Sequence, residues 1–190
     1  MGTIKTTNIE PIADNGTVTL GSSGDTFQTA SGVVSRLGVF ESQLLHVRDE
    51  KASGTNGGDF TSGAWRTRTL NTIKTNEITG ASLSSNQITL PTGTYYINAS
   101  APGYDVTRHQ TALYNITDSS FEIIGTSEYT NSADLVQTRS FVSGRFTISG
   151  QKTFELQHRC EVTKVTFGFG VGSNFSQIGV FANVEIWRTA

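Results

Sequence analysis

The stretch Thr153–Val162, TFELQHRCEV, alternates between apolar and polar residues more regularly than any other run in the chain. A period of two is typical of an antiparallel β-strand with one buried face, because successive side chains of a strand point to opposite sides. The apolar face would carry Phe154, Leu156, His158, Cys160 and Val162, and the polar face Glu155, Gln157, Arg159 and Glu161. A polar face this long is unusual in a chain with few charges, so it meets either water or a second copy of the chain.

Composition favours an all-β fold. Only 35% of the 190 residues are hydrophobic and 16% are charged, and Ser and Thr fill much of the difference. Thr, Val, Ile, Phe and Tyr favour half-buried strand positions, and the 20 glycines supply turns. Aromatic residues are present and the net charge is only -2, which argues against a disordered chain.

Eight to ten strands are expected from about Gln43 onward, separated by turns at intervals of roughly 8–12 residues. Leu44–Asp49 opens this domain as a short strand. On the strand Thr94–Ser100, Tyr95, Ile97 and Ala99 would face one way, and Tyr96, Asn98 and Ser100 the other. No segment has a convincing helical period. The spacing predicts an antiparallel sandwich, barrel or jelly roll over residues 41–190.

Residues 1–40 differ from the rest of the chain. They contain short β-prone pieces cut by Asn-Gly, Gly-Ser-Ser-Gly and Ser-Gly turns, and no piece is long or apolar enough to close a core. We predict an attachment arm or stem that is ordered by packing on a partner, on a sister chain or on the main domain. A flexible tail is the alternative.

Charge and hydropathy exclude several classes of function. The densest basic grouping, Arg66 and Arg68, is too small for a nucleic-acid-binding surface. No run approaches the 18 apolar residues of a membrane-spanning helix. The single cysteine, Cys160, excludes an internal disulfide framework. We therefore expect neither nucleic-acid binding nor membrane insertion.

No catalytic or metal-binding motif stands out. His158 and Cys160 share a strand face two residues apart, which suits two metal ligands, but no third ligand is near in sequence, so both are expected to pack in the core. Glu155 and Glu161 would lie roughly 20 Å apart on one strand, too far for a glycosidase pair. We expect no cofactor, no metal and no enzymatic activity.

Several strands carry aromatic residues on both faces, as at Tyr95 and Tyr96 and around Phe181 and Trp187. Strands that are apolar on both faces imply that the outer face of a sheet is covered, commonly by another subunit. The alternating Phe-Gly run at Phe167–Gly172 agrees, because glycine lets neighbouring backbone come close. Flanking loops of the same chain are the alternative cover.

Three segments resemble the jelly rolls of tumour-necrosis-factor-like proteins and of complement globular heads. They are LPTGTYYINASAP (90–102), FTISGQKTFELQHRC (146–160) and GVFANVEIWRT (179–189), in that order. Knob domains of that superfamily trimerise through an inner sheet that includes the middle and terminal strands. The resemblance therefore implies a homotrimer, with interface candidates on those strands. The candidates are Tyr96, Gln157, Arg159, Phe181 and Trp187.

A second resemblance concerns the N-terminal region. TIKTTNIEP (3–11) and TLGSSGDTFQTASG (19–32) look like the N-terminal pieces of fibre and decoration proteins from marine tailed phages of the cyanophage type. In those proteins such pieces form stems or attachment arms ahead of a jelly-roll tip. The resemblance implies that residues 1–40 attach the chain to other virion proteins.

Together the resemblances imply a trimeric fibre or knob on the virion surface, active in host adsorption, with a host cell-surface glycan or protein as a further partner. Two alternatives stay open. In the first, the chain is a capsid decoration (cement) protein that stabilises the head. In the second, which the lack of catalytic motifs disfavours, it is a glycan-active enzyme. No motif in the chain matches a receptor-contacting loop.

Overall fold

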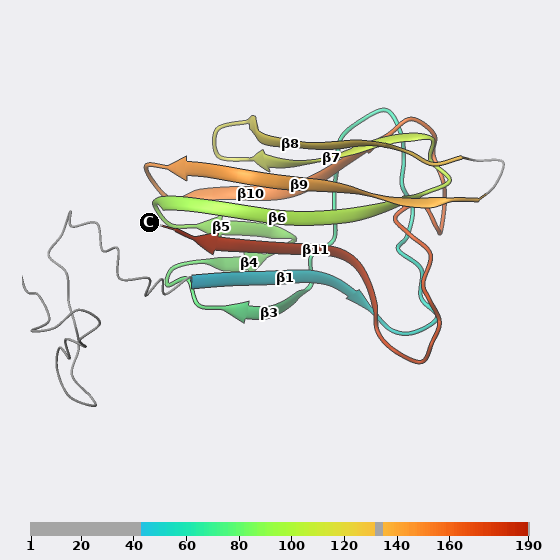
Figure 1. Cartoon of the computed structure of the whole chain (residues 1–190), viewed down its shortest axis with the longest axis horizontal. Helices are drawn as coiled ribbons and strands as arrows, with labels where there is room; N and C mark the ends of the chain where they lie inside the picture. The colour runs from blue at the N-terminus through green and yellow to red at the C-terminus, as the bar shows by residue number, and fades with distance from the viewer. Residues whose placement is uncertain (1–42, 132–134, 190) are drawn as a thin grey trace, which may run out of the picture. The chain divides into compact units, whose positions relative to one another are not determined.

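The computed structural model describes residues 43–131 and 135–189, and within them the chain forms eleven β-strands and no helix (Figure 1). The strands are β1 (Gln43–Lys51), β2 (Arg66–Thr67), β3 (Thr72–Asn76), β4 (Ser82–Ser84), β5 (Gln87–Leu90), β6 (Gly93–Tyr104), β7 (Arg108–Asn115), β8 (Ser120–Tyr129), β9 (Gln137–Ile148), β10 (Lys152–Cys160) and β11 (Gly179–Arg188). The all-β prediction is confirmed. The predicted arm, residues 1–40, lies outside the described residues.

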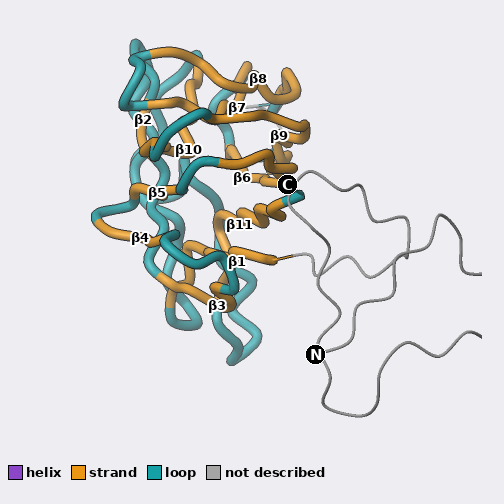
Figure 2. Tube along the Cα trace, turned by 90° about the vertical axis from the view of Figure 1, so that its left-hand side faces the viewer, coloured by secondary structure: helices purple, strands orange, loops and turns teal. Residues whose placement is uncertain are grey.

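The strands form two antiparallel sheets that pack face to face. One has the order β3-β1-β11-β6-β9, and the other has the order β4-β5-β10-β7-β8, with β2 added alongside β10. We name them the β11 sheet and the β10 sheet after their central strands. Figure 2 shows the two layers end-on, with β4, β5 and β10 on one side and β1, β11, β6 and β9 on the other.

The chain crosses repeatedly between the layers. From β5 onward every connection except the β7–β8 hairpin carries the chain from one sheet to the other. Strands that are neighbours in a sheet are therefore far apart in sequence, as in the pairing of β1 with β11. This winding is the jelly-roll arrangement that the turn spacing predicted.

The core lies between the sheets and is built by strand alternation. On β6, Tyr95, Ile97 and Ala99 point inward and are at most 1% exposed, as predicted. On the neighbouring strand β11, Val184 and Ile186 point inward from the same face of this sheet. Burial of these apolar side chains is the main stabilising contribution to the sandwich.

Strand β10 largely follows its predicted pattern. Phe154, Leu156, His158 and Cys160 are all buried. Val162 is not, because β10 ends at Cys160 and Val162 lies beyond it with 44% of its surface exposed. The prediction was therefore right for four positions of the apolar face and wrong for the fifth.

The Phe-Gly run after β10 packs against its own domain. Phe169 contacts Phe60, with ring centroids 4.5 Å apart. A Cβ added at Gly168 would lie 2.6 Å from the Cβ of Phe60, so the glycine permits this close approach. Here the cover comes from a loop of the same chain, which was the alternative to a second subunit.

None of the described residues belongs to a helix long and apolar enough to cross a membrane.

Candidate functional site

The outer face of the β11 sheet carries rows of side chains that strand pairing aligns across three strands. The rows, read from β1 through β11 to β6, are Leu44–Trp187–Tyr96, His46–Glu185–Asn98 and Arg48–Asn183–Ser100. We call the first the aromatic row. The other two are polar.

The aromatic row leaves large apolar surface open. Tyr96 is 43% exposed, and its ring centroid lies 6.4 Å from that of the half-buried Trp187, at an interplanar angle of 48°. The hydroxyl groups of Tyr96 and Ser143 are 2.7 Å apart, which fixes the outer end of the tyrosine. Farther along the same face, Phe141 on β9 is 46% exposed. Trp and Tyr on an open face are the side chains that most often anchor protein interfaces.

Most charged side chains beside the aromatic row have partners within the chain, but the exposed Arg145, which lies opposite Tyr96 on β9, has none among the described residues. Nε of Arg48 donates to Oδ1 of Asn183 at 3.0 Å. Glu50 lies 3.6 Å from Arg48 and 3.5 Å from Lys74. Such surface pairs contribute little to stability, but they leave Arg145 as the one cation of this face without a partner among the described residues. A second copy would meet no large field of one sign here.

Three of the five interface candidates from the sequence do not join this surface. Phe181 has the strand parity of Trp187 but is only 3% exposed. A Cβ at Gly170 would come within 2.9 Å of the Phe181 ring and 2.8 Å of Pro102, so this loop covers the phenyl ring. Phe181 is therefore covered within its own chain.

Gln157 and Arg159 lie on β10, in the other sheet from Tyr96 and Trp187. Since β10 turns its apolar side to the core, their side chains point away from the β11 sheet. The structure thus brings Tyr96 and Trp187 together and separates Gln157 and Arg159 from them. The five residues do not form one surface.

Part of the polar face of β10 is covered by its own chain. Glu155 accepts hydrogen bonds from Thr67 at 2.7 Å, from Gln87 at 3.1 Å and from Gln157 at 3.0 Å. Burial acts to raise the pKa of the Glu155 carboxyl, but these three hydrogen bonds outweigh it and lower the pKa. This half of the strand is a hydrogen-bonded network, and the exposed Arg159 lies beyond it.

The inner face of the β10 sheet carries a buried pair of histidines, His109 and His158. The sequence predicted only His158 as a core residue. Nδ1 of His109 is 2.9 Å from Nε2 of His158, and Nε2 of His109 is 2.8 Å from the hydroxyl of Thr138. Nδ1 of His158 has no partner. We assign the proton of His158 to Nε2, because only a lone pair is then left unsatisfied.

The environment keeps both rings neutral. Burial, with a smaller contribution from the charge of Arg68, lowers the pKa of His109 to about 4. Burial also lowers the pKa of His158 well below its usual value, and the charges of Arg68, His109 and Arg139 add to this effect. A second proton in this pocket would be both desolvated and repelled.

Arg68 is the residue that sequence reasoning most clearly missed. It is fully buried and donates hydrogen bonds to the carbonyl oxygens of Pro102, Phe169 and Phe181 at 3.4, 3.1 and 3.3 Å. Its guanidinium carbon lies 4.0 Å from the Phe169 ring centroid. Burial lowers its pKa to about 9, and Asp49 opposes this shift. Arg68 thereby ties the Phe-Gly loop to the ends of β6 and β11.

A metal centre finds little support around Cys160. Its Sγ is 3.8 Å from the carbonyl oxygen of Phe60, and burial raises the pKa of the thiol to about 11. Within residues 43–131 and 135–189, no group of three or more His, Cys, Asp or Glu side chains could hold a metal ion. His158 pairs with His109 instead of sharing a ligand set with Cys160.

Comparison with known proteins bears on the fold. No family model matches the chain, and no curated protein matches it. Among solved structures, murine APRIL at pH 5.0 is 9% identical, covers 78% of this chain and 99% of its own, and has a TM-score of 0.50. The globular domain of zebrafish complement 1qA is 9% identical, covers 76% of this chain and 94% of its own, and has a TM-score of 0.47. The described domain has the tumour-necrosis-factor-like jelly-roll fold, as predicted.

Proposed function

We propose that the chain is a homotrimeric knob of a phage virion, displayed on the particle and used in adsorption to the host surface. The observation that carries the assembly is the aromatic row on the outer face of the β11 sheet. Tyr96 and Trp187 are neighbours there, and most charges beside them are paired. A second and a third copy of the chain are the occupants that would cover this face.

Two further points support a trimer. Proteins with this jelly-roll fold commonly form homotrimers. Closed threefold symmetry also covers the same patch on every copy and leaves no free patch to which further copies could add. Burial of Tyr96 and Trp187 at a threefold interface would remove the largest aromatic pair from the outer surface of this sheet.

The setting on a virion rests on the resemblance of the N-terminal segments. In this proposal residues 1–40 form the arm that attaches the knob to other virion proteins, and residues 41–190 form the knob. The knob itself is proposed to bind and not to catalyse. Display in three copies would add avidity to weak single contacts with a host glycan or protein.

Light scattering coupled to size-exclusion chromatography tests the assembly. The expected mass is three times the 20.4 kDa of one chain at micromolar concentration. A mass of one chain would overturn the trimer. The virion setting needs a second measurement, namely quantification of this chain in purified particles. A copy number that matches the capsid lattice and not the fibres would favour the decoration-protein alternative.

A further inference from the structure

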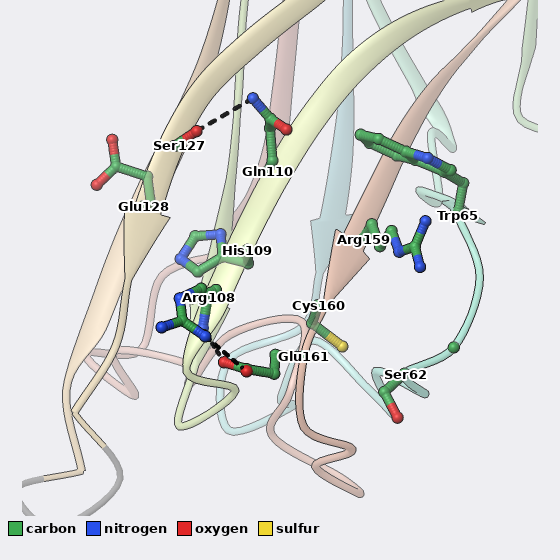
Figure 3. Close-up of a pocket in the computed structure, with 11 residues that line it drawn as sticks. Ser62, Trp65, Arg108, His109, Gln110, Ser127, Glu128, Arg159, Cys160 and Glu161 are labelled. Carbon is green, nitrogen blue, oxygen red and sulfur yellow. Dashed lines mark hydrogen bonds and ion pairs between the residues drawn. The ribbon is translucent and has the colours of Figure 1, made fainter.

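A groove of about 620 Å³ opens on the outer face of the β10 sheet (Figure 3). This volume is within the range of small-molecule binding sites in proteins. Its lining comes from the loop before β2 and from β7, β8 and the end of β10. The residues are Ser62, Gly63, Trp65, Arg108, His109, Gln110, Ser127, Glu128, Arg159, Cys160 and Glu161.

The floor of the groove is a row of hydrogen-bonding side chains. Strand pairing aligns Arg159 on β10, Gln110 on β7 and Ser127 on β8. Nε2 of Gln110 donates to the carbonyl oxygen of Gly125 at 2.9 Å and contacts the hydroxyl of Ser127 at 3.3 Å. The amide is therefore held in place, and its oxygen stays available as an acceptor. The guanidinium of Arg159 has no hydrogen-bond or ion-pair partner within the described part of the chain.

One wall of the groove is aromatic. The ring of Trp65 lies 4.9 Å from that of Phe121, which in turn lies 5.1 Å from that of Tyr114. These tilted ring contacts hold the indole over the outer face of the sheet. In Figure 3 the indole is directed toward Gln110. A half-buried Trp beside a polar floor offers a flat apolar surface next to hydrogen-bonding groups.

The charges around the groove are few and mostly paired. Arg108 and Glu161 form an ion pair at 2.7 Å. Glu128 also contributes to the lining, but its strand parity is opposite to that of Ser127 and its carboxylate is directed away from Gln110 (Figure 3). The guanidinium of Arg159 is therefore the one charge without a partner that faces the groove among the described residues. An acidic ligand would still meet the carboxylate of Glu161, and a basic ligand would meet two guanidinium groups, so the groove favours an uncharged ligand rich in hydroxyl groups.

The groove is suited to binding and not to bond cleavage. The hydrogen bond from Thr107, together with contacts from Arg108, lowers the pKa of Glu161, so this carboxyl is a poor proton donor. The thiol of Cys160 is protonated and points to a buried carbonyl oxygen. Neither group supplies an acid or a nucleophile to a bound molecule.

We propose that this groove binds an uncharged glycan, with one pyranose ring stacked on Trp65 and its hydroxyl groups bonded to Arg159, Gln110 and Ser127. A pyranose has a face of C–H groups and a rim of hydroxyls, which matches one aromatic wall above a polar floor. The planar guanidinium of Arg159 can donate to two neighbouring hydroxyls, and the amide oxygen of Gln110 can accept from a third. The proposal rests on the function proposed above and names the ligand class of the adsorption step.

The location of the groove fits that function. It lies on the outer face of one sheet, and the aromatic row lies on the outer face of the other. Assembly through the aromatic row would leave each groove open to solvent. A trimer would then present three glycan sites, so millimolar single-site affinities could give useful avidity.

The chain offers a direct readout because its two tryptophans, Trp65 and Trp187, lie one on each face. In a Trp187→Phe protein, all tryptophan fluorescence reports on the groove, while a ring is kept in the aromatic row. The full chain is titrated with uncharged hexose oligosaccharides and with the same oligosaccharides carrying a terminal uronic or sialic acid. Saturable change in Trp65 emission with the uncharged set is expected.

Variants then assign the binding. Arg159→Ala is expected to weaken affinity about tenfold or more, because a charge-assisted hydrogen bond is lost from an exposed side chain that holds no other residue. Arg145→Ala, an exposed arginine on β9 of the other sheet, is the matched control and should leave the affinity unchanged. Trp65→Ala, measured by calorimetry, is expected to abolish binding. Its thermal unfolding curve shows whether the variant is folded.

Distinct outcomes overturn the inference. No change in Trp65 emission with any oligosaccharide at millimolar concentration removes the glycan site, and binding confined to the acidic set removes the uncharged ligand class. Equal losses in Arg159→Ala and Arg145→Ala place the sugar elsewhere. The proposed function fails separately. A monomeric chain that still binds glycan at Trp65 refutes the trimer and supports the site. A trimer that binds no glycan refutes the site and supports the trimer.

Discussion

The two sheets turn different chemistry to the outside. The β11 sheet exposes a tyrosine beside a half-buried tryptophan, and apart from Arg145 the charges around them are paired. The β10 sheet exposes a polar groove with an arginine that lacks a partner among the described residues. Exposed aromatic surface favours a protein partner, whereas an open polar floor favours a small hydrophilic ligand. Under the functions proposed above, one domain would carry assembly and recognition on opposite faces.

The insides differ as well. The inner side of the β11 sheet is built mainly from aliphatic and aromatic residues, such as Ile97 and Val184. The inner side of the β10 sheet holds the His109–His158 pair, in which His109 lies near the start of β7 and His158 near the end of β10. Only the β10 sheet therefore carries buried imidazoles that titrate below neutral pH. The predictions that follow test each side of this difference.

The largest effect is expected from removing both members of the aromatic pair. Tyr96→Ala with Trp187→Ala should weaken assembly by about 4 kcal/mol, about 2 kcal/mol for each interface aromatic. Sedimentation velocity over a concentration series measures the shift from trimer to monomer. Phe175→Ala, which removes an aromatic ring that is 80% exposed on a loop, is the control and should leave assembly intact. An undiminished trimer in the double variant would remove the β11 face from the interface.

Acid is expected to destabilise the β10 side. Because the folded-state pKa of His109 lies at about 4, below its unfolded value of about 6.5, the unfolded chain binds a proton that the fold excludes. Stability is thus complete above about pH 6.5 and decreases as the pH falls toward 4. The loss from His109 alone is about 3 kcal/mol. His158 acts in the same direction.

Urea unfolding at pH 7, 5.5 and 4.5 measures this loss, in the Tyr96→Ala/Trp187→Ala protein so that assembly makes no contribution. NMR of the imidazole carbons should show His109 neutral down to about pH 4. Equal stability at pH 7 and pH 4.5 would contradict the assigned pair. It would also remove the difference between the two inner sides.

A smaller effect is expected at the covered half of the β10 outer face. Glu155→Ala removes the acceptor of hydrogen bonds from Thr67, Gln87 and Gln157, and should cost about 1 kcal/mol because the network is partly solvated. Glu155→Gln keeps an acceptor oxygen and should cost less. Urea unfolding at pH 7 compares the two. Equal stability of wild type and Glu155→Ala would show that the network contributes nothing.

Alternation along single strands made much of the fold predictable. The inward set on β6 and four positions of β10 followed from a period of two. The short strands β3 and β4 were not predicted, because Thr72–Asn76 and Ser82–Ser84 are too short and too polar to show a pattern. Their place at the sheet edges comes from pairing with β1 and β5.

The candidate surface was predicted only in part, for a physical reason. Parity decides which way a side chain points from its strand, but long-range pairing decides which sheet the strand joins. Parity therefore placed Tyr96 and Trp187 on one outer face, whereas it could not show that Gln157 and Arg159 belong to the other sheet. Arg68 was missed because its acceptors, such as the carbonyl oxygen of Phe169, come from loops far along the chain.

The smallest effect separates the two outer faces most sharply. Gln157→Ala with Arg159→Ala should change the free energy of assembly by less than about 0.5 kcal/mol, because both side chains point away from the aromatic row. The same variant should lose glycan affinity through Arg159. Sedimentation and calorimetry on one preparation give both numbers. If assembly were lost and glycan binding kept, the polar face of β10 would be the interface, and recognition would have to move to the β11 sheet. A change in both would mean that the faces are coupled, which a rigid sandwich with separate outer surfaces does not allow.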